Sequence, residues 1–474
     1  MAGRRKTDTT PNGPTRRRPK RGGPQGGMPH RAQTVPEPDA GESPARRGPR
    51  PLALHLLTAQ VAWSGLRTVL PALNAGLPPW PPNLAREAES LRANLLAESP
   101  TLADQNPADL RQALIDAVDR AGERRLLEFT AGVRAYRDHP YRRDLSEPPV
   151  LWRDGTTRLL DYGVRGKGAR GAVLVVPSLV NRAYVLDLTA RTSLMRHLAG
   201  EGFRPLLVDW DAPGPAEKAF GLDEYIAGRL EGALDAAVAA HGGPVAVLGY
   251  CMGGNLALAL ALRRPQDVSG LACLATPWDF QADGPISTPL EPTMAAHLAA
   301  AIEAMPECPV DLLQAMFASL DPFLVSRKYR AFAKNAGGKD ELFVAIEDWV
   351  NDGVPLASKV ASQCLVGWYG QNTPVLGRWW VAGEIVDPAR LRCPALVIIP
   401  ARDRIVPPKS AMALAAAIPQ AECVSVPSGH VAMIVGDQGP RLTWRPLVAW
   451  LSSLTAISTP AAKRSRGRAK RKSA

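Results

Sequence analysis

The sequence has 474 residues, of which 46 % are hydrophobic and 22 % are charged. This length predicts two or three domains, or one large domain with appended segments, and the composition excludes a collagen-like, coiled-coil or wholly disordered chain. No run approaches the roughly 18 apolar residues of a membrane span, and residues 1–50 contain no apolar stretch of a secretory signal. We therefore expect a cytoplasmic protein with no membrane span.

The formal net charge of +12 is concentrated at the two ends of the chain. Residues 1–50 contribute +8 and residues 463–474 contribute +7, which leaves −3 for the residues between them. A basic fold would indicate nucleic acid as the main ligand, but this fold is slightly acidic. Because the two ends contain few large apolar residues, we expect 1–50 and 456–474 to be disordered basic tails.

Residues 51–165 are predicted to form a helical N-terminal region. Apolar residues recur there at three-to-four spacing in the stretches 54–63, 84–98 and 109–136. A different pattern begins after Tyr162, where short apolar runs alternate with helical stretches. The expected strands are 171–179, 204–210, 244–250, 268–277, 393–402 and 422–430, and the expected helices are 191–202, 222–243, 255–265, 409–419 and one near 440–453.

This alternation predicts the α/β class, with a doubly wound, mostly parallel sheet covered by helices on both faces. The sheet domain is divided into residues 166–277 and 391–455. The interruption, residues 278–390, contains five of the eleven tryptophans. An insertion of this size is expected to form a cap or lid over the active-site edge. Alternatively, its tryptophans fill a second small core.

The strongest local motif is Gly249-Tyr250-Cys251-Met252-Gly253, between an expected strand and an expected helix. It has the form of the G-x-S-x-G nucleophile elbow, with Cys in place of Ser. The elbow exposes its central residue at the carboxyl edge of the sheet and at a helix N-terminus, where the helix dipole favours a thiolate. The alternative is a buried cysteine in a tight turn. The other five cysteines show no CxxC or Cys/His cluster, so we expect no metal site.

A nucleophile elbow requires an acid and then a histidine further along the chain. Only His297 and His430 follow Cys251, and His297 falls on a helical stretch of the insertion. His430 follows the last expected strand, and Asp403 ends the strand before it. We therefore predict Cys251 as nucleophile, His430 as base and Asp403 as the acid that orients the imidazole. The backbone N–H groups of Met252 and of the loop 177–180, with Leu179 as the candidate, are predicted to hold the oxyanion.

The choice of cysteine as nucleophile favours acyl transfer from a thioester over hydrolysis. Thiol attack on a thioester is close to isoenergetic, so the acyl group stays activated for a second acceptor. Serine is the commoner nucleophile in hydrolysis.

Several segments resemble one family, the polyhydroxyalkanoate synthases of the α/β-hydrolase superfamily. The elbow GYCMGGNLALALA resembles their Cys-containing lipase box, and 176–210, ARDRIVPP, PSGHVAMIVG and the Trp-rich stretch of the insertion are similar to further family segments. Where the family usually has His after the catalytic Asp, this chain has Arg404.

The resemblance implies transfer of (R)-3-hydroxyacyl groups from coenzyme A to a growing polyester, with release of CoA and without a cofactor. It also implies a homodimer with a mobile cap that works at the surface of a polyester granule. Two alternatives stay open. One is a depolymerase or thioesterase on the same scaffold, with water as acceptor. The other is a non-catalytic adaptor whose basic tails bind a granule surface or nucleic acid.

Overall fold

The computed structural model describes residues 45–74, 107–163, 170–283, 290–335 and 340–458. The expected helix at 84–98 and nearly all of the two expected tails lie outside these ranges. Within them, every helix is too short or too polar to cross a lipid bilayer.

The centre of the molecule is a sheet of eight strands in the order β1-β2-β4-β3-β5-β6-β9-β10. All neighbours from β4 to β10 are parallel, and β1 and β2 are antiparallel to their neighbours. The strands are β1 (Val150–Asp154), β2 (Thr157–Asp161), β3 (Gly171–Val176), β4 (Phe203–Asp209), β5 (Val245–Tyr250), β6 (Val268–Leu274), β9 (Ala395–Pro400) and β10 (Glu422–Val426). The prediction of a mostly parallel α/β sheet is confirmed.

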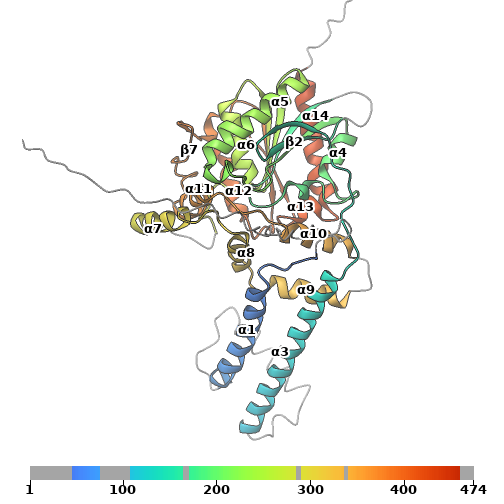
Figure 1. The fold of residues 1–474 in the computed structure, drawn as a ribbon, viewed down its shortest axis with the longest axis vertical. Helices are drawn as coiled ribbons and strands as arrows, with labels where there is room; N and C mark the ends of the chain where they lie inside the picture. The colour runs from blue at the N-terminus through green and yellow to red at the C-terminus, as the bar shows by residue number, and fades with distance from the viewer. Residues whose placement is uncertain (1–44, 75–106, 164–169, 284–289, 336–339, 459–474) are drawn as a thin grey trace, which may run out of the picture. The chain divides into compact units, whose positions relative to one another are not determined.

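Helices cover both faces of the sheet (Figure 1), and two hydrophobic clusters lie between them and the strands. One cluster includes residues of α5 (Glu231–His241), α6 (Met252–Arg263) and α12 (Pro408–Ala417). The other includes residues of α4 (Leu194–Gly200), α13 (Ala432–Val435) and α14 (Arg445–Ser458). Strands buried on both faces need apolar side chains at every position, which explains the continuous apolar runs GAVLVV and VAVLGY.

In the described residues, five α-helices follow β6 before the chain returns to the sheet at β9. They are α7 (Pro292–Glu303), α8 (Val310–Ser319), α9 (Leu324–Lys334), α10 (Glu341–Asn351) and α11 (Ser358–Ser362). The described part of the insertion also contains a π-helix, η5 (Gln363–Gly370), a two-stranded ribbon of β7 (Trp380–Val381) and β8 (Glu384–Ile385), and a 3-10 helix, η6 (Pro388–Arg390).

The N-terminal region is only partly helical, which corrects the prediction for residues 51–165. Helix α1 (Leu52–Asn74) contacts α3 (Pro107–Arg137), and α3 packs against α9 around Phe129, Tyr136 and Tyr329. Residues 150–161, however, form the first two strands of the sheet. These strands are five residues each and lie at an edge, so their sequences lack the long apolar runs that mark the central strands.

The inner boundaries of both expected tails are corrected by the described residues. Residues 46–50 are ordered by polar contacts of Arg46 and Arg50 with distant helices, and residues 456–458 belong to α14. Composition alone misplaced the N-terminal boundary, because an arginine-rich segment can be ordered by distant acidic partners that its own sequence does not reveal.

Candidate active site

Cys251 lies in the turn between β5 and α6, with a backbone conformation that is rare for a residue with a side chain. Its φ is 55° and its ψ is −131°. Strain of this kind is maintained only where the surrounding structure enforces it, and it is typical of functional sites. The turn places the thiol at the carboxyl edge of the sheet and at the N-terminus of α6, as the elbow motif predicts.

Glycines allow the elbow to form because backbone atoms approach them closely. A Cβ at Gly249 would lie 2.3 Å from the Cα of Gly254, and one at Gly253 would lie 2.1 Å from the carbonyl oxygen of Val176. Neither contact could be relieved by turning a side chain. The two motif glycines therefore let α6 start directly against β5 and β3.

We expect Gly253→Ala to lower the free energy of unfolding by roughly 3 kcal/mol, because the added methyl group overlaps the main chain of β3. Urea unfolding followed by circular dichroism measures the change. The matched control is Gly200→Ala in α4, where no atom lies within 4 Å of the added Cβ. If the Gly253→Ala variant has the same urea midpoint as the wild type, the elbow is not as closely packed as described.

Asp403 and His430 come together in the loops after β9 and β10. These strands pair in parallel with Val426 beside Pro400, so both loops leave the same edge of the sheet. The imidazole Nδ1 of His430 lies 2.7 Å from Oδ2 of Asp403, and both side chains are buried. Oδ1 of Asp403 accepts hydrogen bonds from the amides of Ile405 (2.8 Å) and Val406 (2.9 Å). The carboxylate is therefore fixed by its own loop and presents one oxygen to the histidine.

The electrostatics of the site favour a charged imidazole. Burial disfavours the charge, but the negative charge of Cys251, the hydrogen bonds to Asp403 and Cys251, and the charge of Asp403 together raise the pKa of His430 to about 10. Tyr250 packs against the imidazole of His430, with the two ring centroids 5.3 Å apart. The Tyr250 hydroxyl also donates to the carbonyl oxygen of His430 at 3.2 Å. The site is arranged to hold a protonated imidazole beside the sulfur of Cys251.

The structure brings Cys251, Asp403 and His430 to one site and leaves His297 outside it. His297 is exposed on α7 and does not line the cavity that Cys251 lines. Met252 is the first residue of α6, where a backbone N–H has no partner within the helix, and it lines the cavity. Leu179 is buried in the core cluster and does not line the cavity. Its neighbours Ser178 and Val180 do, but the Val180 amide donates to Ser178 Oγ at 3.1 Å.

An apolar cavity of about 170 Å³ adjoins Cys251 and His430. The insertion supplies much of its wall, through Phe280, Leu313, Met316, Phe317, Trp349, Trp368 and Tyr369. The sequence indicated only that a tryptophan-rich insertion would cover the site, and no local pattern identified these residues. The alternative of a second small core is wrong, because Trp278, Trp368 and Trp379 belong to a large hydrophobic cluster that packs on the sheet. Trp349 and Trp368 line the cavity, Trp278 and Trp379 are buried in the core, and Trp380 is exposed.

Arg404 connects the loop of Asp403 to the insertion. Its guanidinium lies 2.6 Å from Oδ2 of Asp321, between α8 and α9, and Arg327 binds the same oxygen at 2.6 Å. Because the Arg404 side chain is 73 % exposed, water screens this pair. We expect Arg404→Ala to change the free energy of unfolding by less than about 1 kcal/mol, as measured by urea unfolding. A larger loss would mean that this ion pair contributes to the fold.

Comparison with known proteins places the chain in a family. Residues 171–437, more than half of the chain, match the family described by the alpha/beta hydrolase fold, and the chain is a member of it. Three similar proteins share the name poly(3-hydroxyalkanoate) polymerase subunit PhaC. The one from Thiocystis violacea is 30 % identical over 287 residues, which cover 59 % of this chain and 80 % of that protein.

The protein from Allochromatium vinosum is 29 % identical over 286 residues, covering 59 % of this chain and 80 % of that protein. The one from Haloferax mediterranei is 26 % identical over 318 residues, which cover 65 % of this chain and 64 % of that protein. Within the α/β hydrolases, the chain belongs to the poly(3-hydroxyalkanoate) polymerase family.

Proposed function

We propose that this protein is an acyltransferase that polymerises (R)-3-hydroxyacyl groups from coenzyme A thioesters, with release of CoA, through Cys251, His430 and Asp403. The observation that carries the proposal is a cysteine at a nucleophile elbow, beside a buried His–Asp pair and an apolar cavity. The names of the relatives support the substrate class. The substrate carries its own activated group, so the reaction needs no cofactor.

In the first step, the Cys251 thiolate attacks the thioester carbonyl carbon. A C–S bond forms to the enzyme, the C–S bond to CoA breaks, and the proton of His430 goes to the leaving CoA thiolate. The backbone N–H of Met252 is placed at the helix N-terminus to stabilise the oxyanion. A second donor is proposed from the loop 177–180, of which Ser178 and Val180 line the cavity and Leu179 does not.

In the second step, the 3-hydroxyl of a substrate or chain end attacks the acyl carbon on Cys251, and a base takes its proton. A C–O ester bond forms, the C–S bond to the enzyme breaks, and Cys251 is released as the thiolate. His430 is the better candidate for this base. The Asp403 carboxylate already accepts two amide hydrogen bonds on one oxygen and faces His430 with the other. The apolar wall supports transfer to an alcohol over hydrolysis, because it offers an acyl chain close contacts and offers water few hydrogen-bond partners.

Incubation of the purified protein with (R)-3-hydroxybutyryl-CoA tests the proposal. Insoluble polyester formed in step with free CoA is the expected result. Free hydroxy acid without polymer would instead indicate a thioesterase or depolymerase on the same scaffold.

The same assay on a chain lacking residues 1–44 and 460–474 separates catalysis from a role of the basic ends. We expect this deletion to keep the activity, because the described site contains none of these residues. An adaptor that acts through its tails would lose its localisation on a granule or nucleic acid and have no activity to keep. Homodimerisation and granule binding stay proposals that rest on the family resemblance.

A further inference from the structure

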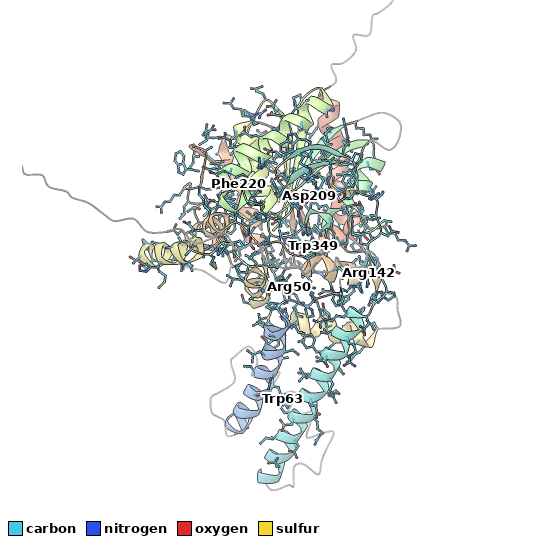
Figure 2. The ribbon with its side chains drawn as sticks, viewed as in Figure 1. Arg50, Trp63, Arg142, Asp209, Phe220 and Trp349 are labelled. Carbon is cyan, nitrogen blue, oxygen red and sulfur yellow. The ribbon has the colours of Figure 1, made fainter. Side chains whose placement is uncertain are left out.

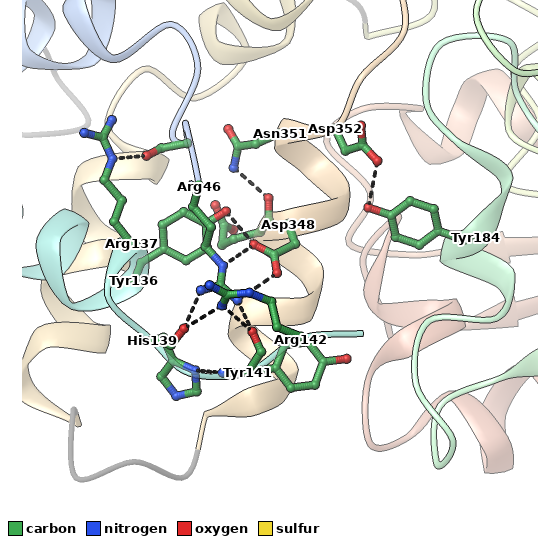
Figure 3. Close-up of polar contacts among 12 residues, drawn as sticks. Arg46, Tyr136, Arg137, His139, Tyr141, Arg142, Tyr184, Asp348, Asn351 and Asp352 are labelled. Carbon is green, nitrogen blue, oxygen red and sulfur yellow. Dashed lines mark hydrogen bonds and ion pairs between the residues drawn. The ribbon is translucent and has the colours of Figure 1, made fainter. Parts of the chain in front are cut away.

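Arg46 is a buried cation at the start of the described chain. Only 6 % of its side chain is exposed, and its guanidinium binds both oxygens of Asp348 on α10, at 2.6 and 3.2 Å. The same group donates to the carbonyl oxygens of His139 and Tyr141, just beyond α3 (Figure 3). One side chain therefore joins the N-terminal segment, the end of α3 and α10.

Residues 46–51 are here called the strap. Beyond Arg46, the strap contacts α10 again and also α8. The Arg50 amide donates to Oδ1 of Asn351 on α10 at 2.8 Å, and its Nε donates to Oδ1 of Asp311 on α8 at 2.9 Å. The backbone passes so close that a Cβ at Gly48 would lie 2.5 Å from the Asn351 side chain. The strap thus contacts two helices of the insertion.

Both of these helices also form part of the cavity wall. Trp349 and Val350 of α10 line the cavity that Cys251 lines, as does Gln314 of α8. Gln314 Nε2 donates to the carbonyl oxygen of Val350 at 2.8 Å, so the two helices are linked to each other. Successive residues of an α-helix point about 100° apart. Asp348 can therefore bind the strap while its neighbours Trp349 (labelled in Figure 2) and Val350 reach the cavity.

We propose that Arg46 is a positioning residue of the active site. By binding Asp348 it holds α10, and with it the linked helix α8, where they set the width of the cavity at Cys251. The size of acyl group that reaches the thiol then depends on a residue outside the cavity. The part of this inference that concerns acyl groups rests on the proposed function, whereas the part that concerns cavity width does not.

The physical basis is the cost of leaving a carboxylate without its partner. Without Arg46, Asp348 keeps the hydrogen bond from the Tyr136 hydroxyl (2.9 Å) and loses its charge-assisted bonds to the guanidinium. A partly buried charge in this position is expected to move toward water, and α10 moves with it. On the other side, Trp349 Nε1 remains bonded to the Arg182 carbonyl oxygen at 2.8 Å, so the helix loosens without detaching.

The test measures the access of two reagents to Cys251. Full-length protein is treated with iodoacetamide or with its N-octyl derivative, and alkylation of the Cys251 peptide is followed by mass spectrometry. We expect Arg46→Met and Asp348→Asn to raise the rate ratio of the bulky to the small reagent by about threefold or more. The double variant should give a ratio no higher than that of either single variant, because the two substitutions affect the same interaction and the double variant leaves no unpaired charge.

Arg142→Met is the matched control. The exposed Arg142 donates to the same two carbonyl oxygens, of His139 (3.0 Å) and Tyr141 (2.8 Å), but is not bonded to Asp348. Its ratio should stay at the wild-type value. If Arg46→Met does not fold, Arg46→Lys is measured instead. Lysine keeps the positive charge but lacks the planar guanidinium that binds both oxygens of Asp348, so we expect a ratio between the wild-type value and the threefold rise.

An unchanged ratio in the Arg46 and Asp348 variants would overturn the proposal, even if their thermal stability falls. An equal rise in Arg142→Met would also overturn it. A second measurement compares kcat/KM for 3-hydroxyacyl-CoA substrates with short and long acyl chains, where Arg46→Met should shift the preference toward the longer chain. The alkylation result stands even if no polymer forms, so the two proposals fail separately.

Discussion

Cys251→Ala is expected to form no acyl-enzyme with (R)-3-hydroxybutyryl-CoA and to lower the rate of CoA release by about 10³-fold or more. The alanine removes the only atom that can form the covalent bond of the proposed first step. Quenched single-turnover reactions analysed by intact-protein mass spectrometry measure the acyl adduct. Detection of the adduct in this variant would show that another residue is the nucleophile.

Cys364→Ala provides a matched control for this experiment. Cys364 lines the same cavity, but burial raises the pKa of its thiol, so it stays protonated and unreactive. We expect this variant to acylate Cys251 normally. Loss of acylation in both variants would mean that the cavity, rather than the thiol of Cys251, had been damaged.

The alanine variant also tests the electrostatics of the site. Because the charge of Cys251 and its hydrogen bond raise the pKa of His430, their removal should lower that pKa below the wild-type value of about 10. NMR titration of the imidazole resonances measures it. A pKa unchanged by the substitution would mean that the sulfur and the ring do not interact.

Asp403→Asn is expected to reduce activity by roughly 10²- to 10⁴-fold while the fold persists. The asparagine oxygen can still accept the amides of Ile405 and Val406, so the loop keeps its geometry. Its NH₂ group then faces Nδ1 of His430, where the carboxylate oxygen had been, and the imidazole is forced into the wrong tautomer. Steady-state CoA release measures the loss, and near-wild-type kinetics would remove Asp403 from the mechanism.

The same substitution should change the pH dependence of stability. The pKa of His430 is raised from 6.5 to about 10, so its contribution to the free energy of unfolding is fully present below pH 6.5. That contribution is lost as the pH rises toward 10. Because Asp403 accounts for part of the raised pKa, the stability difference between wild type and Asp403→Asn should shrink between pH 6.5 and 10. Urea unfolding across this range measures it.

The sequence by itself predicted the residues of the candidate site and determined the order of the core elements. The elbow at Cys251 depends on residues adjacent in the chain, because glycines at 249 and 253 are what a tight strand-to-helix turn requires. The positions of Asp403 and His430 followed from chain order, since each comes directly after a strand and parallel strands end at one edge. Apolar runs and helical spacing are local patterns, so they predicted the sheet and its covering helices.

Only the tertiary structure decided what surrounds that site. Arg46 and Asp348 are 302 residues apart, and no local sequence pattern indicates that the two residues form an ion pair. Strands β1 and β2 joined the sheet through pairing with β4, which their short sequences do not specify. The cavity wall likewise depends on which faces of α8 and α10 turn inward. These features arise from contacts between distant segments, whose free energy is set by three-dimensional packing and not by neighbouring residues.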